Sequence, residues 1–163
     1  MKKISFALLA FALIATAISG CASHKNNSTA MNSTSKGNLT GTWVVSDVKR
    51  EGFPNDYQIK NAFNMAPYES FVGSIWRLYG SYKGQISLTN GNTESIYWDL
   101  LNGDTAPVFQ FKRVPEGVKA RDVREGYRLD ISWIDSNHLS LRSPFSIENG
   151  TTAYIVYNLE RQK

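Results

Sequence analysis

Hydrophobic and polar residues alternate in short stretches along most of the chain beyond residue 39. The clearest alternation lies near residue 130, where every second residue is large and apolar: Tyr127, Leu129, Ile131 and Trp133. A period of two predicts a β-strand with one buried face and one solvated face. Asn-Gly pairs at 90–91 and 149–150 are typical of tight turns between such strands. The pattern therefore predicts an all-β domain of short antiparallel strands.

Eight strands are predicted, over residues 39–50, 71–78, 83–89, 95–100, 108–112, 127–133, 139–142 and 152–161. Their steady spacing and short connections favour an antiparallel meander, closed as a barrel or packed as a sandwich. One connection has a helical period instead of a period of two, and Pro67 ends it. Its apolar residues at helical spacing are Ile59, Ala62, Phe63 and Ala66. A short amphipathic helix is therefore predicted over 54–66, between the first two strands.

The two ends of the predicted domain carry residues that can meet. Gly41 precedes Trp43 in the first strand, and the last strand ends at Arg161. A guanidinium over an indole face forms a cation–π pair, and such a pair would join the first strand to the last, as closure of a barrel requires. The alternative is that Trp43 is an ordinary core residue at the start of a β-domain.

The first 38 residues are predicted to be a targeting signal followed by a tether. Lys2 and Lys3 precede an apolar run over 4–18 and then Ser19-Gly20-Cys21, which predicts a secretory signal peptide over 1–20. Small residues directly before Cys21 resemble the bacterial lipobox. The resemblance implies cleavage after Gly20, diacylglycerol on the Cys21 sulfur and a fatty acyl chain, such as palmitate, on the new amino terminus. At ~0.8 kcal/mol per buried methylene these chains anchor the protein permanently.

Residues 21–38 are predicted to be the lipidated cysteine and a flexible tether rich in Ser, Thr and Asn, followed by one domain over 39–163. The second residue of the mature chain is Ala22 rather than the aspartate associated with retention in the inner membrane. Residues 22–27 contain no acidic run of the kind that some lineages use for surface export. We therefore expect an outer-membrane position facing the periplasm.

Several short motifs together look like the lipocalin-like lipoproteins of Gram-negative bacteria. The motifs are Gly41-Thr42-Trp43, residues 71–76, residues 109–112, residues 126–129 and the terminal 158–161. The resemblance covers the whole predicted domain and implies an eight-stranded up-and-down barrel. It also implies that Trp43 and Arg161 stack at the closed end. The chain departs from the family in its shorter strands and in the predicted helix.

Alternation directs large aromatic rings to the interior: Trp76, Trp98, Phe109, Phe111, Tyr127, Trp133 and Tyr157. An eight-stranded barrel is just wide enough to be filled by side chains or to hold one small ligand. An aromatic pocket suits an apolar ligand, but the same rings can simply fill a core. Two functions stay open. One is a carrier of a small hydrophobic molecule in the cell envelope, and the other is a tethered adaptor with a filled barrel that contacts another envelope protein.

Catalysis, metal binding and cofactor binding are not expected. Cys21 is committed to lipid, and His138 is the one histidine in residues 39–163, so a catalytic triad or a His-rich metal site cannot be assembled. The net charge of +4 includes Lys2 and Lys3 and is +2 without them, which gives no basis for nucleic-acid binding. Asp104-Thr105-Ala106 resembles an O-glycosylation site of some Gram-negative bacteria, and it places Thr105 in a predicted turn.

Overall fold

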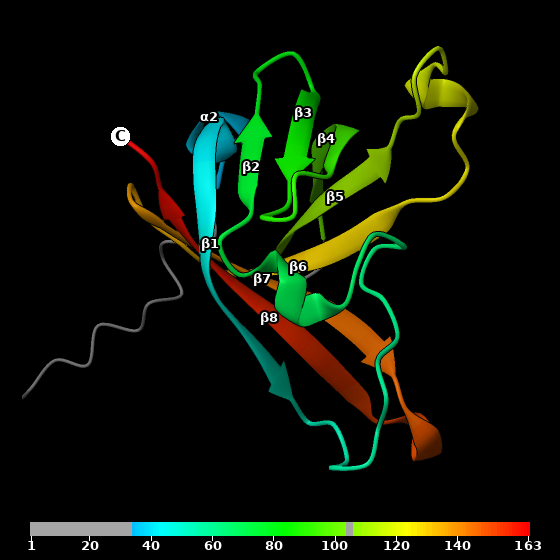
Figure 1. The fold of residues 1–163 in the computed structure, drawn as a ribbon. Helices are drawn as coiled ribbons and strands as arrows, with labels where there is room; N and C mark the ends of the chain where they lie inside the picture. The colour runs from blue at the N-terminus through cyan, green and yellow to red at the C-terminus, as the bar shows by residue number, and fades with distance from the viewer. Residues whose placement is uncertain (1–33, 104–105) are drawn as a thin grey trace, which may run out of the picture.

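The computed structural model describes residues 34–103 and 106–163, and these form a closed barrel of antiparallel strands that follow one another in chain order (Figure 1). The strands are β1 Gly41–Glu51, β2 Ile75–Leu78, β3 Lys83–Ser87, β4 Thr93–Asn102, β5 Pro107–Arg113, β6 Tyr127–Ile134, β7 His138–Ser146 and β8 Thr152–Arg161. This topology confirms the predicted up-and-down barrel. Cys21 and Thr105 lie outside the described residues, so their predicted modifications stay predictions.

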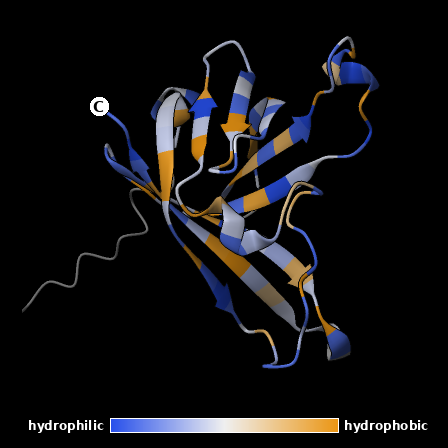
Figure 2. Ribbon diagram, viewed as in Figure 1, coloured by the Kyte–Doolittle hydropathy of each residue, from blue (hydrophilic) through white to orange (hydrophobic). Residues whose placement is uncertain are grey.

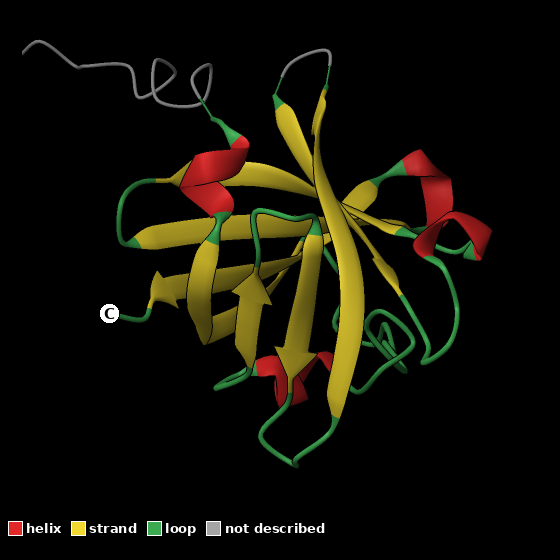
Figure 3. Ribbon diagram, turned by 90° about the horizontal axis from the view of Figure 1, so that it is seen from above, coloured by secondary structure: helices red, strands yellow, loops and turns green. Residues whose placement is uncertain are grey.

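In residues 34–103 and 106–163, the helices are single turns, drawn in red in Figure 3. They are α2 (Lys36–Leu39) and the 3-10 turns η1 (Tyr68–Phe71), η2 (Ala120–Asp122) and η3 (Glu148–Gly150). None of the helices in the described part of the chain has the length and apolar character needed to cross a membrane. Helix α2 begins at Lys36, just before the predicted domain boundary at Leu39.

The helix between the first two strands is present, but not where the sequence placed it. It is the turn η1 at Tyr68–Phe71, whereas residues 54–66 form a loop. Phe63 and Asn64 have φ angles of 55° and 51°, which a right-handed helix does not allow. A segment of this length makes only a marginal helix by itself, so packing decides its conformation. The apolar period over 54–66 reflects burial in the barrel mouth, not a helical stripe.

One end of the barrel is closed by the predicted tryptophan–arginine pair. Trp43 is paired with Arg161 across β1 and β8, and the guanidinium carbon lies 4.1 Å from the ring centroid. Arg161 also donates hydrogen bonds to the carbonyl oxygens of Asn38 (2.6 Å), Thr40 (2.8 Å) and Ser136 (2.7 Å). First strand, last strand and the β6–β7 turn are thereby fastened at one point.

The other end of the barrel is splayed. The β1–β2 ladder stops at Val44↔Ile75, and the β6–β7 ladder begins only at Asp130↔Arg142. By contrast, β8 stays paired to both β1 and β7 as far as Glu51↔Tyr154 and Ser146↔Thr152. Strands β7, β8 and β1 therefore extend as a ribbon past the barrel, and the long β1–β2 connection runs beside that ribbon (Figure 1).

Apolar and polar residues alternate along the strands in Figure 2, as the sequence predicts. The inward residues form one continuous buried cluster to which every strand contributes. The largest of its fully buried side chains are Trp43, Trp76, Trp98, Tyr157, Phe71, Phe109 and Phe111. At 25–30 cal/mol per Å² of apolar surface removed from water, these rings dominate the core.

Candidate functional site

The predicted interior rings meet in one aromatic cluster. Trp76, Trp98, Phe109, Phe111 and Tyr157 are completely or almost completely buried, and Tyr127 is half-buried against them. Neighbouring ring centroids lie 5.1 to 6.3 Å apart with tilted or edge-to-face geometry, the range in which aromatic pairs attract. These rings come from β2, β4, β5, β6 and β8, so the cluster connects five of the strands across the barrel interior.

Trp133 does not belong to this cluster, and its prediction as an inward residue is wrong. It is 37% exposed, and its indole nitrogen donates to the Asp135 carboxylate at 3.2 Å. The register of β6 against β7 shifts between Ile131 and Trp133, which leaves Ser132 as an extra residue. A bulge of this kind reverses the alternation, so Trp133 turns outward and Ile134 turns inward.

Phe63 is the site residue that the alternation argument missed, because it lies in a loop and not in a strand. Its ring packs at centroid distances of 5.1 to 6.2 Å against rings from the strands and from η1: Phe71, Trp76, Phe111, Tyr127 and Tyr157. The loop turns sharply at this point, since the Ala62 amide donates to the Ala66 carbonyl at 2.8 Å. Phe63 therefore extends from the β1–β2 connection into the splayed end of the barrel, and we call this residue the plug. The sequence signal that could have identified Phe63 as buried is the apolar character of its neighbours at 59, 62 and 66.

Polar contacts hold the plug at its rim. The side-chain amide of Asn64 donates to Glu125 at 2.7 Å, and the same carboxylate oxygen accepts the Tyr127 hydroxyl at 2.8 Å. The Asn64 carbonyl accepts Arg113 at 2.7 Å, and Arg113 is also paired with Glu94 at 2.9 Å. We call Asn64, Arg113, Glu125 and Tyr127 the latch. Burial, followed by Glu125, raises the pKa of Tyr127 to about 12, so this hydroxyl is a donor at any physiological pH.

The Tyr157 hydroxyl lies at the centre of the apolar cluster without a partner. Its side chain is fully buried, and the hydroxyl has no hydrogen bond within the described residues. Burial, with a smaller contribution from the Glu69 charge, raises its pKa far above the ordinary tyrosine value. A buried hydroxyl with no partner costs ~1–3 kcal/mol, and such groups are rare in native structures. It is the one polar group that the cluster offers to a ligand.

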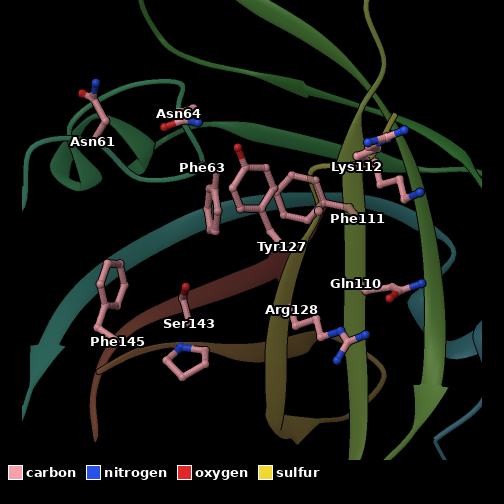
Figure 4. Close-up of a pocket in the computed structure, with 13 residues that line it drawn as sticks. Asn61, Phe63, Asn64, Gln110, Phe111, Lys112, Tyr127, Arg128, Ser143 and Phe145 are labelled. Atoms are coloured by element: carbon pink, nitrogen blue, oxygen red, sulfur yellow. The ribbon is translucent and has the colours of Figure 1, made fainter. Parts of the chain in front are cut away.

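A surface cleft of about 630 Å³ opens at the same end (Figure 4). Figure 4 shows the rings of Phe63, Phe111 and Tyr127 side by side, with Phe145 and Ser143 across from them. Asn61, Lys112 and Arg124 add polar groups to the lining. The volume falls in the range of small-molecule sites. Phe63, Phe111 and Tyr127 belong both to the cleft lining and to the aromatic cluster, so the cleft reaches the cluster directly.

The described residues contain no group of three or more His, Cys, Asp or Glu side chains positioned to hold a metal ion. His138 is the first residue of β7, directly after the β6–β7 turn, and its Nδ1 is 3.1 Å from an Asp135 oxygen. The backbone amides of Asn137 and His138 donate to that carboxylate and, with His138, hold the pKa of Asp135 well below its usual range. This arrangement stabilises the β6–β7 turn.

No family model matches the chain, and no curated protein matches its sequence. Among solved structures, the chain is similar to bovine odorant-binding protein in complex with a selenium-containing odorant. The TM-score is 0.40 and the identity 10%, over 80% of this chain and 74% of that chain. At this level the likeness carries no argument about ligand or activity. The assignment of an eight-stranded up-and-down barrel comes from the chain's own strand order and register.

Proposed function

We propose that this chain is a lipoprotein of the outer membrane, anchored through Cys21 and facing the periplasm, that binds one small hydrophobic ligand in the mouth of its barrel. The observation that supports ligand binding best is the position of Phe63. A ring at the centre of the aromatic cluster is supplied by a loop, next to an open cleft, while the rings around it come mainly from strands. The ligand takes the place that Phe63 occupies.

Phe63 is easier to displace than the other rings of the cluster. Phe111, Trp76 and Tyr157 are held by ladders of backbone hydrogen bonds on both sides of their strands. The plug depends on the latch and on the short Ala62–Ala66 closure. The left-handed φ of Phe63 also costs roughly 1–2 kcal/mol, which the loop recovers when it leaves, whereas Asn64 adopts that conformation readily.

The surroundings define the class of ligand. After Phe63 leaves, the vacated space is walled by aromatic rings and contains the unpartnered Tyr157 hydroxyl. An apolar molecule of about one ring or a short chain, carrying one hydrogen-bonding group, satisfies both features. Above it, Lys112 and Arg124 at the cleft favour a neutral or negatively charged outer end.

The test uses the purified full-length protein in detergent. N-phenyl-1-naphthylamine is titrated while the tryptophans are excited, and energy transfer from Trp76 and Trp98 reports a probe inside the cluster. We expect saturable transfer with one site per chain. Phe63→Ala should tighten binding by tenfold or more, because a competing ring is removed. Phe53→Ala is the matched control, since Phe53 lies in the same connection but packs against Tyr57 and Phe145.

Unchanged affinity in Phe63→Ala, or equal tightening in Phe53→Ala, would contradict the role of the plug. Mass spectrometry of small molecules that copurify from the native host then identifies the natural ligand. A wild-type protein that neither carries a molecule nor responds to the probe favours the second candidate, a tethered adaptor. That candidate is supported by one specific observation, which is that rings already fill the interior.

A further inference from the structure

Exposed tyrosines gather where the β2–β3 turn lies beside β4, since Tyr79 and Tyr82 are in that turn and Tyr97 is in β4. Tyr79, Tyr82 and Tyr97 are 46%, 40% and 36% exposed. The rings of Tyr82 and Tyr97 are stacked, with centroids 5.7 Å apart and planes 12° from parallel. Val118, in the β5–β6 connection, is 41% exposed and lines the same groove as Tyr79 and Tyr97. We call these four residues the tyrosine face.

Lysines surround the tyrosine face. Lys83 and Lys112 are the cross-strand neighbours of Tyr97 on either side, in β3 and β5. Lys119 lines the groove, as does one acidic residue, Glu116, and the Lys36 ammonium lies over the Tyr82 ring. Within residues 34–103 and 106–163, none of these lysines has a carboxylate partner within ion-pair distance. The face therefore combines amphipathic rings with positive charges that are not neutralised.

The chain enters the folded domain at this same face. Helix α2 is the first element of the described structure, and its Lys36 contacts Tyr82 and lies 5.2 Å from the Trp98 ring centroid. Figure 1 shows α2, the β2–β3 turn and the β5–β6 connection on one side of the barrel, away from the β7–β8 ribbon. Lys36 follows Cys21 by fifteen residues. As a coil, that length would reach about 20 Å, little more than the ~14 Å radius of gyration of such a domain.

We propose that the tyrosine face rests on the anionic phospholipid surface to which the chain is anchored. This inference relies on the lipid anchor of the proposed function, but not on ligand binding. Tyrosine rings favour the water–bilayer interface, where one edge is apolar and the hydroxyl is hydrated. Each lysine near an anionic surface adds about 1 kcal/mol. The short tether raises the local concentration of this face at the membrane, so a modest intrinsic affinity is enough. The barrel is thereby held in one orientation on the membrane.

The test compares two exposed valines in the full-length acylated protein. Val118→Cys places a nitroxide label on the tyrosine face, and Val72→Cys places one beyond the opposite end of β2, at 46% exposure. Both proteins are reconstituted into vesicles of phosphatidylcholine containing phosphatidylglycerol. Collision of each label with oxygen and with a water-soluble nickel chelate gives its depth. We expect the Val118 label to be protected from the chelate and the Val72 label to stay in water.

Charge and ring variants complete the test. Lys83→Glu and Lys119→Glu, made in the Val118→Cys background, should each lower the ratio of docked to undocked protein roughly fivefold or more, as about 1 kcal/mol per lysine requires. Tyr79→Ser should release the label as well. A Val118 label as accessible to the chelate as the Val72 label would overturn the proposal. So would a label immobilised in native envelopes but free on vesicles, because that result identifies a protein partner.

Failure of this inference is distinguishable from failure of the proposed function. Ligand binding is measured in detergent without a bilayer and reads the barrel interior. Cys21 without acyl groups, detected by mass spectrometry, would overturn the anchor and the docked face together. Acylated protein with a fully aqueous Val118 label would overturn the docked face alone.

Discussion

Replacing Phe63 by alanine and by glycine gives a sharp test of the plug, because the two variants differ in backbone freedom and leave nearly the same cavity. Phe63 is buried among aromatic rings, so removing its ring should cost ~3–5 kcal/mol if the space stays open. That is a large part of the 5–15 kcal/mol that typically stabilises a domain. At an ordinary core position, glycine would cost a further ~0.5–1 kcal/mol.

At Phe63 we expect the opposite order, with the glycine variant more stable than the alanine variant. Its φ of 55° is left-handed, a conformation that glycine adopts freely and alanine does not. Phe63→Gly should therefore be less destabilising than Phe63→Ala by about 1 kcal/mol. Urea unfolding followed by tryptophan emission measures both, with the slope of free energy against urea checked for constancy. The same pair of substitutions at Phe109, a fully buried strand residue in β5, should show the ordinary order.

Two results would refute the reasoning. If Phe63→Ala costs less than ~1 kcal/mol, the ring does not fill the barrel mouth in solution. If Phe63→Gly is less stable than Phe63→Ala, the backbone there is not left-handed, and the proposed strain that favours release of the plug does not exist.

Other substitutions test the closed end, the latch and the bulge. Gly41→Ala should destabilise the protein by more than ~1 kcal/mol in a thermal melt, because φ is 142° and an added Cβ would collide with the guanidinium of Arg161. Gly80→Ala is the control and should have little effect, since an added Cβ there meets no neighbouring atom. Arg161→Lys keeps the charge but loses the planar fork, and it should cost about 2 kcal/mol by urea unfolding. Since the pKa of Tyr127 is raised from 10.0 to about 12, its contribution to stability is complete below pH 10 and is lost as pH rises to 12. Tyr127→Phe should flatten that alkaline decline. Trp133→Ala should cost less than ~1 kcal/mol and leave probe binding unchanged, as an outward ring requires.

Contrary outcomes are equally specific. A large loss in Gly80→Ala would mean that glycine content, and not the approach of Arg161, sets stability at these turns. An alkaline decline that persists in Tyr127→Phe would assign it to other tyrosines. Weaker binding of the probe by Trp133→Ala would place that ring back in the interior.

The sequence by itself determined the strands and the pair of residues that could close them into a barrel. Period-two alternation and Asn-Gly turns are local signals, and a strand needs only its own residues to decide which face is apolar. Trp43 and Arg161 could be matched because closing a meander requires its first and last strands to meet. The inward direction of Trp76, Trp98 and Tyr157 followed from the same period.

The tertiary structure decided what happens where that period breaks. The bulge at Ser132 turned Trp133 outward because register across β6 and β7, not the sequence of β6 alone, sets which side chains face inward. The apolar residues of 54–66 have a helical period, yet the segment forms a loop in which Phe63 has a left-handed φ and packs into the mouth of the barrel. The strain at that residue is offset by rings from strands distant in the chain, and by an Asn64–Glu125 bond between residues 61 positions apart. Interactions of that range have no local signature, so only the folded barrel could place the candidate site.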